Sequence, residues 1–160
     1  MATSPVGGVD REALPGVDER LAGYFDDPPP EPDWTDREAV VAWSLAGERA
    51  FAGPLSVDEA AARAAAEAAF DRSHDPAAAG NHWLVVGGGD DEPLDVHEIA
   101  VPTLVVHGSH DPLFPLPHGQ ALAAAVPGAR LLVVEGMGHQ VPPAPTWDQV
   151  LPAVVALTED

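Results

Sequence analysis

Two short runs of consecutive apolar residues stand out in the C-terminal part of the chain. Residues 102–107 (PTLVVH) precede Gly108, and residues 130–135 (RLLVVE) precede Gly136. Runs of this length that are rich in Val and Leu, without alternation of polar and apolar positions, are typical of strands buried on both faces of a parallel sheet. Each run therefore predicts a buried strand that ends at a glycine.

A helix is predicted after each of these strands. One helix covers residues 118–125, and the other covers residues 146–158, where Thr146 and Gln149 have the spacing of a capping box. The order strand–helix–strand–helix predicts two parallel strands that are joined by a right-handed crossover. The predicted fold class is accordingly α/β.

The first part of the chain has a different pattern, in which apolar residues recur at helical spacing between acidic residues and prolines. Three helices are predicted there, over residues 18–25, 35–52 and 56–72. Thr35 with Glu38, and Ser56 with Glu59, have the spacing of capping boxes at the starts of the second and third helices. Residues 81–86 fit either the end of a helix or a strand.

We therefore divide the chain into a helical segment, residues 1–95, and an α/β segment, residues 96–160. Strands buried on both faces need further strands and helices around them, because two such strands alone leave open sheet edges. The simplest explanation is that the chain is the later portion of a larger α/β protein. The alternative is association through the open edges, either with a copy of itself or with a separate complementing chain.

Composition and charge exclude several kinds of function. The 160 residues include seven basic residues, all arginine, against 26 acidic residues, which gives a net charge of −19. Nucleic-acid binding and attachment to an anionic membrane both need a basic face, so neither is expected. The absence of cysteine excludes disulfides and thiolate metal sites, and the absence of lysine excludes Schiff-base chemistry. Since no apolar run could span a bilayer and no secretion signal is recognisable, a cytoplasmic location is expected.

The main candidates for catalysis are Asp111 and His139, each in the loop that follows a predicted strand. They are 28 positions apart, about one strand–helix–strand unit, and parallel strands place their carboxyl ends at the same edge of a sheet. We predict that the Asp111 carboxylate accepts a hydrogen bond from Nδ1–H of His139, with Nε2 left as a general base. The alternatives are structural roles, with Asp111 as a turn residue before Pro112 and His139 as a loop histidine bonded to backbone.

Several other residues have weaker signals. Three further histidines are near Asp111 in the sequence: His107, His110 and His118. Their spacing is not that of a metal site, so no metal is predicted. Trp83 is a candidate for lining a substrate pocket, and Gly136 and Gly138 are predicted to be needed for backbone angles or close packing.

Residues 99–145 resemble the C-terminal end of the α/β-hydrolase family. In that family the Asp of a G-x-x-D-P loop and the His of a G-x-G-H loop are the last two members of a catalytic triad, and this chain has GSHDP and GMGH. The resemblance implies that Asp111 orients His139, the general base, in the hydrolysis of a small-molecule ester without a cofactor. It also implies that the helical segment is similar to the cap over the pocket. Bacterial esterases and methylesterases are the most similar members.

The chain departs from the family pattern at the nucleophile. The family places its serine in a G-x-S-x-G turn, and none of the five serines of this chain has glycines at both positions. The oxyanion hole of the family also needs an earlier backbone loop. We therefore expect the chain alone to be a weak or silent catalyst. The alternatives are a non-catalytic module that complements or binds a separate chain, and a truncated reading frame.

Overall fold

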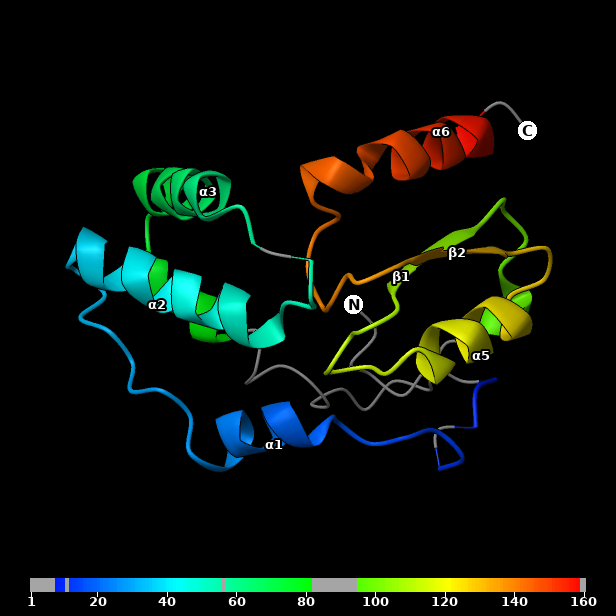
Figure 1. Ribbon diagram of the computed structural model, residues 1–160, viewed down its shortest axis with the longest axis horizontal. Helices are drawn as coiled ribbons and strands as arrows, with labels where there is room; N and C mark the ends of the chain where they lie inside the picture. The colour runs from blue at the N-terminus through cyan, green and yellow to red at the C-terminus, as the bar shows by residue number, and fades with distance from the viewer. Residues whose placement is uncertain (1–7, 11, 56, 82–94, 159–160) are drawn as a thin grey trace.

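The structure is a computed structural model, which describes residues 8–10, 12–55, 57–81 and 95–158 (Figure 1). The helical segment contains α1 (Glu19–Asp26), α2 (Arg37–Phe51) and α3 (Glu59–Arg72). The α/β segment contains β1 (Leu104–Gly108), α5 (Pro117–Ala125), β2 (Arg130–Val134) and α6 (Trp147–Thr158). Short 3-10 turns are formed by Pro76–Gly80, Val96–Glu98 and Ala144–Thr146. Every predicted helix and strand is present, with ends shifted by a few residues.

The two strands form a parallel pair, as predicted. Leu104 lies opposite Arg130, and the register continues to Gly108 opposite Val134. Helix α5 joins the strands, and α5 and α6 lie on either side of them (Figure 1). Both strands therefore end at the same edge of the sheet, where the two candidate loops begin.

The predicted burial of both strands is only partly correct. Val134 and Gly108, at the carboxyl ends, are buried, but residues 131–133 of β2 are only half-buried. Among the described residues the sheet has just these two strands, which do not have enough neighbours to cover both faces. The core around the sheet consists of Val134, Met137 and Val150, with Leu55, Val106 and Leu132 packed against it.

Two of the three predicted helix caps are wrong in detail. The N-cap of α2 is Asp36 rather than Thr35: its side chain accepts hydrogen bonds from the backbone N–H groups of Glu38 and Ala39. The Thr35 hydroxyl instead donates to the Asp33 carboxylate, at 2.7 Å. An aspartate placed directly before the first turn has taken the role of the hydroxyl residue.

Of the other two predicted caps, the one at Ser56 is replaced, and the one at Thr146 stays a prediction. Asp58 is the N-cap of α3, with its carboxylate accepting from Ala61 N, and Ser56 lies outside the described residues. The Thr146 hydroxyl donates to the carbonyl of Pro143, at 2.8 Å, within the 3-10 turn before α6. Residues 82–86 of the ambiguous segment are also outside the described residues, and the predicted domain boundary at residue 95 stays a prediction. No described helix combines the length and hydropathy of a membrane span.

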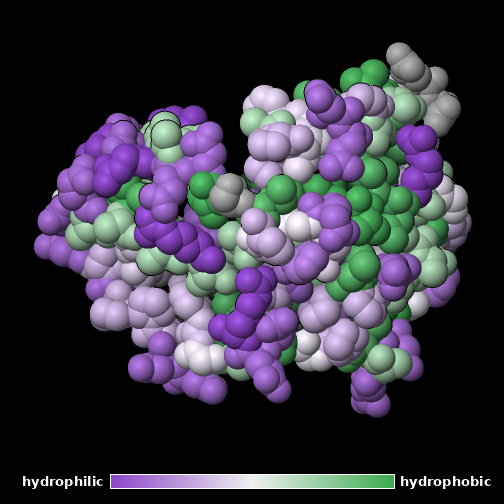
Figure 2. All heavy atoms as spheres, viewed as in Figure 1, coloured by the Kyte–Doolittle hydropathy of each residue, from purple (hydrophilic) through white to green (hydrophobic). Residues whose placement is uncertain are grey.

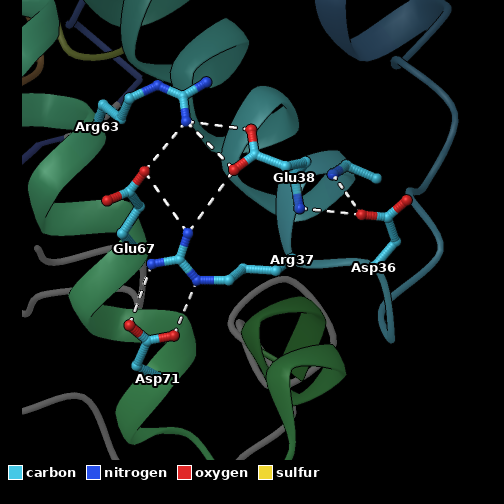
Figure 3. Close-up of polar contacts among 7 residues, drawn as sticks. Asp36, Arg37, Glu38, Arg63, Glu67 and Asp71 are labelled. Atoms are coloured by element: carbon cyan, nitrogen blue, oxygen red, sulfur yellow. Dashed lines mark hydrogen bonds and ion pairs between the residues drawn. The ribbon is translucent and has the colours of Figure 1, made fainter.

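Ion pairs join α3 to α2 (Figure 3). Helix α3 has no buried residue, as its alanine-rich sequence suggests, so its apolar contacts are few. Arg37 of α2 donates to both carboxylate oxygens of Asp71 on α3, at 2.9 and 3.1 Å. Arg63 of α3 donates to Glu38 on α2 and to Glu67 on α3, each at 3.1 Å. The arginines of α2 and α3 thus hold the two helices together by pairing with a few of the many carboxylates.

These ion pairs predict a dependence of stability on pH. Hydrogen bonds from Arg37 hold the pKa of the Asp71 carboxyl below its usual value. A carboxyl group with a lowered folded-state pKa stabilises the fold above its unfolded pKa, about 4, and this contribution is lost as the pH falls. Acidification also relieves repulsion among the many other carboxylates, so the effect has to be measured as a difference.

We expect the urea midpoint of the wild-type chain to fall relative to that of Arg37→Ala when the pH changes from about 6 to about 3. The variant lacks the pair, so it has no such contribution to lose. A difference between the two midpoints that stays constant over this pH range would contradict the assignment.

Candidate active site

The carboxylate of Asp111 is buried in the loop after β1. The side chain of Asp111 is 6% exposed. Its Oδ1 accepts hydrogen bonds from the backbone N–H groups of Leu113 and Phe114, at 2.9 and 2.8 Å. Two donors from the same turn therefore fix the carboxylate and offset part of the cost of burying its charge.

The second oxygen of this carboxylate is directed at His139. Oδ2 of Asp111 lies 2.8 Å from Nδ1 of His139, in the loop after β2. The predicted approach of the two side chains is therefore confirmed, and their catalytic roles stay predictions. Because an ionised carboxylate can only accept, Nδ1 of the imidazole carries the proton, and the lone pair of the neutral ring is on Nε2.

The imidazole of His139 is also held by two aromatic rings. The ring of Phe114 lies 5.6 Å from it, edge to face, and the ring of Phe51 lies 6.1 Å away. The backbone N–H of His139 donates to the carbonyl of Phe51, at 2.8 Å. Phe114, three residues after Asp111, could have been found from the loop sequence. No local signal connects His139 with Phe51, at the end of α2.

The other histidines of this region bond to backbone carbonyls or to a neighbouring side chain. Nε2 of His107 donates to the carbonyl of Phe114, at 2.8 Å, and Nε2 of His118 donates to that of Pro15, at 2.8 Å. Nδ1 of His110 accepts from the Ser109 hydroxyl, at 2.8 Å. Within the described ranges, no three His, Cys, Asp or Glu residues are grouped so as to hold a metal ion.

A cavity of about 530 Å³ adjoins the Asp111–His139 pair. Its lining includes the four consecutive residues 105–108 of β1, together with Leu122 of α5 and Met137. Side chains alternate between the faces of a strand, so four consecutive residues can line one cavity only along the edge of the strand. The candidate base thus opens onto the edge of β1 that has no partner among the described residues. Trp83, the predicted pocket residue, lies outside the described residues.

The described serines have structural roles. Ser44 donates to the carbonyl of Val40 within α2, at 2.9 Å, and Ser73 accepts from Asp75 N after α3, at 3.2 Å. The hydroxyl oxygen of Ser109 accepts from Gly136 N, at 2.8 Å, and so joins the two loops of the candidate site. Ser4 and Ser56 are outside the described residues.

Comparisons with known proteins agree with this architecture. Residues 77–150 match the family model described as TAP-like protein, a branch of the α/β-hydrolases. Over 48 residues the chain is 38% identical to a rhodomycin D methylesterase of Streptomyces peucetius. These 48 residues are 30% of this chain and 16% of that protein. The fold is that of an α/β-hydrolase. The sequence and structure of this chain represent part of it.

Two solved structures show how much of the α/β-hydrolase fold is represented. The esterase RhEst1 from Rhodococcus sp. ECU1013 matches with a TM-score of 0.55 and 18% identity, over 89% of this chain and 49% of that one. A 2-hydroxy-6-oxo-6-phenylhexa-2,4-dienoate hydrolase from Rhodococcus sp. strain RHA1 matches with a TM-score of 0.55 and 17% identity. The match covers 99% of this chain and 53% of that one. This α/β-hydrolase chain therefore spans about half the length of these structures.

The bonds of Asp111 predict that its loss destabilises the fold more than the loss of His139. Asp111→Ala removes the acceptor of two backbone N–H groups, and we expect it to lower the free energy of unfolding by about 2–4 kcal/mol. His139→Ala removes a partly buried ring, and we expect about 1 kcal/mol. Urea unfolding at neutral pH measures both. Asp26→Ala, at an exposed helix end, is the matched control and changes stability by less than about 0.5 kcal/mol. An Asp111→Ala effect no larger than that of the control would contradict this account.

Proposed function

We propose that the chain provides the acid and base of an α/β-hydrolase that hydrolyses carboxylic esters by a Ser-His-Asp mechanism. The observation that carries this proposal is the 2.8 Å contact between His139 Nδ1 and Asp111 Oδ2, beside a cavity at the carboxyl ends of two parallel strands. Open α/β sheets bind their ligands at this edge. The partial matches to a methylesterase and an esterase support the same chemistry.

In this mechanism His139 moves one proton in each of two steps. A serine hydroxyl attacks the ester carbonyl as its proton passes to Nε2 of His139, and the imidazolium then protonates the leaving alkoxide as the acyl–enzyme forms. Water hydrolyses the acyl–enzyme with the same proton transfers in turn. The Asp111 carboxylate holds the ring in the required tautomer and stabilises the imidazolium, because it is buried and acts at short range. No cofactor takes part.

The serine and the oxyanion hole come, we propose, from a further segment that also supplies the remaining strands, here called the complementing segment. The 160 residues contain no G-x-S-x-G turn, and the chain spans about half of the matched structures. The chain alone is then a weak or silent catalyst, since losing the nucleophile costs orders of magnitude in rate. Helices α1–α3 act as the cap of the pocket, and the substrate is a small ester that fits a mainly apolar cavity.

Hydrolysis of p-nitrophenyl acetate tests this proposal. The purified chain is expected to match its His139→Ala variant, because neither has an activated nucleophile. Co-expression with an upstream in-frame segment that encodes G-x-S-x-G is expected to raise the rate at least about 10³-fold, and His139→Ala is expected to abolish the gain. Robust hydrolysis by the chain alone that is lost in His139→Ala would overturn the claim of inactivity. Co-expression without any gain would overturn the esterase assignment.

A second candidate function is that of a non-catalytic module that binds the complementing segment as a separate chain. The exposed face of α6 favours it: Trp147, Leu151 and Val155 recur at helical spacing and are 50%, 52% and 54% exposed. In Figure 2 apolar surface gathers over the strands below α6, whereas the α2–α3 side is mainly hydrophilic. Both the helix face and the edge of β1 would be covered by a partner that adds a parallel strand and a helix.

Sedimentation of the isolated chain tests this exposed surface. We expect the wild-type chain to self-associate, because it has no complementing segment to cover α6. Leu151→Glu with Val155→Glu is expected to shift it toward the monomer, whereas Ala124→Glu, at an exposed position of α5, is the matched control and leaves it unchanged. A stable hetero-complex with a separate chain would support the module, and a well-folded wild-type monomer would count against it.

A further inference from the structure

The turn between α2 and α3 lies directly against the loop that contains His139. Two backbone hydrogen bonds cross between them: His139 N donates to Phe51 O at 2.8 Å, and Leu55 N donates to Gly136 O at 2.9 Å. The side chain of Leu55 also packs on the core formed by Val134 and its neighbours. The helical segment is therefore bonded to the main chain of the candidate base itself.

Two glycines allow this close approach. A Cβ atom on Gly53 would overlap the carbonyl oxygen of Gly136 and the backbone of Met137 and Gly138. A Cβ atom on Gly138 would overlap the backbone nitrogen of Gly53 and the carbonyl oxygen of Phe51. The overlapped atoms belong to the backbone, so a side chain at either position would force the two segments apart.

Gln140 connects both sides of this contact. Its side-chain oxygen accepts a hydrogen bond from Gly53 N at 3.2 Å and one from Gly138 N at 3.4 Å. Gly53 and Gln140 are 87 residues apart in the chain, so the bond joins the cap helices to the His139 loop. Both donors are partly buried, and each would lose its acceptor if the amide oxygen were removed.

We propose that the turn after α2, fastened by Gln140, is a positioning element for His139. The inference rests on the proposed function, in which His139 is the base. Asp111 fixes the imidazole at Nδ1, whereas the turn fixes the backbone from which the imidazole extends. Asp111 acts on the ring and the turn acts on the backbone, so a displacement of either one changes the direction of Nε2. Any movement of α2 would therefore also move the base.

Hydrogen exchange measured by NMR tests the positioning element without a need for activity. In Gln140→Leu we expect the amides of Leu55 and His139, which donate across the contact, to exchange about tenfold faster. The amides of β1 and β2 are expected to keep their wild-type rates. Gln140→Glu keeps an acceptor oxygen at the same reach, so it is expected to restore slow exchange. Unchanged rates in Gln140→Leu, or a rise shared equally by the sheet, would overturn the proposal.

A pair of glycine variants gives a second measurement. Gly53→Ala is expected to separate the turn from the loop and to broaden or shift the Nδ1 proton signal of His139. Gly23→Ala, in α1, is the matched control because a Cβ there meets nothing within 4 Å. If Gly53→Ala does not fold, Gln140→Leu and Gln140→Glu decide the question. An unshifted Nδ1 signal in folded Gly53→Ala counts against the proposal.

The same variants separate this inference from the proposed function. In the complemented enzyme, Gln140→Leu is expected to lower kcat with little change in KM, and Gln140→Glu is expected to recover kcat. If no ester is hydrolysed, the proposed function fails while the exchange result still decides whether the turn positions His139. If hydrolysis occurs but Gln140→Leu leaves both exchange and kcat unchanged, the positioning role fails alone.

Discussion

A negative charge buried between two loops has to be satisfied by donors, and this requirement organises the site. The carboxylate of Asp111 accepts hydrogen bonds from Leu113 N, Phe114 N and Nδ1 of His139. Two of these donors come from its own turn, and the third comes from the end of the neighbouring strand. Without the parallel pairing of β1 and β2 the third donor would be out of reach. The buried carboxylate would then lack one charged hydrogen bond, and this loss would cost on the order of several kcal/mol.

The chain of attachments from the sheet to the outermost helix becomes weaker with distance from this charge. The His139 loop is held by the Asp111 carboxylate and by the backbone of the turn after α2. Helix α2 buries Val40, Val41 and Leu45. Helix α3 buries none of its residues and is held to α2 by exposed ion pairs, which individually contribute little. The turn after α2 is thus attached to the His139 loop through backbone hydrogen bonds, whereas α3 is attached to α2 through exposed polar side chains.

The sequence predicted the parts of the site that depend on local order and topology. One strand–helix–strand unit separates Asp111 from His139, so parallel pairing alone brings their loops together. The glycines Gly136 and Gly138 were also predicted from the loop, and the positive φ of Gly136, +74°, agrees. Two of the predicted caps were wrong because an aspartate one or two residues after the hydroxyl residue meets the first turn instead. The partial exposure of the strands follows from the number of strands, which the strands' own sequences do not encode.

The contact between the α2–α3 turn and the His139 loop was beyond sequence reasoning for a physical reason. It is made almost entirely of backbone atoms, and backbone groups are the same in every residue type. Gly138 was predicted from its loop, but its sequence does not name the segment that it packs against. Gly53 is followed by proline and is sufficiently explained as the end of a helix. Only the three-dimensional structure shows that the same glycine also admits the backbone of the His139 loop.

The Asp111–His139 pair is supported by other residues of this chain. Phe114 and Phe51 lie against the His139 ring, and Gln140 bonds to the neighbouring Gly53 and Gly138. The hydrogen bond between Asp111 and His139 is thus formed with only the two described strands in place. In the proposed mechanism, the position of the nucleophile relative to Nε2 depends instead on pairing at the edge of β1, because that edge lines the cavity beside His139. Under that proposal, orientation of the base is a property of this chain, and distance to the nucleophile is a property of the completed sheet.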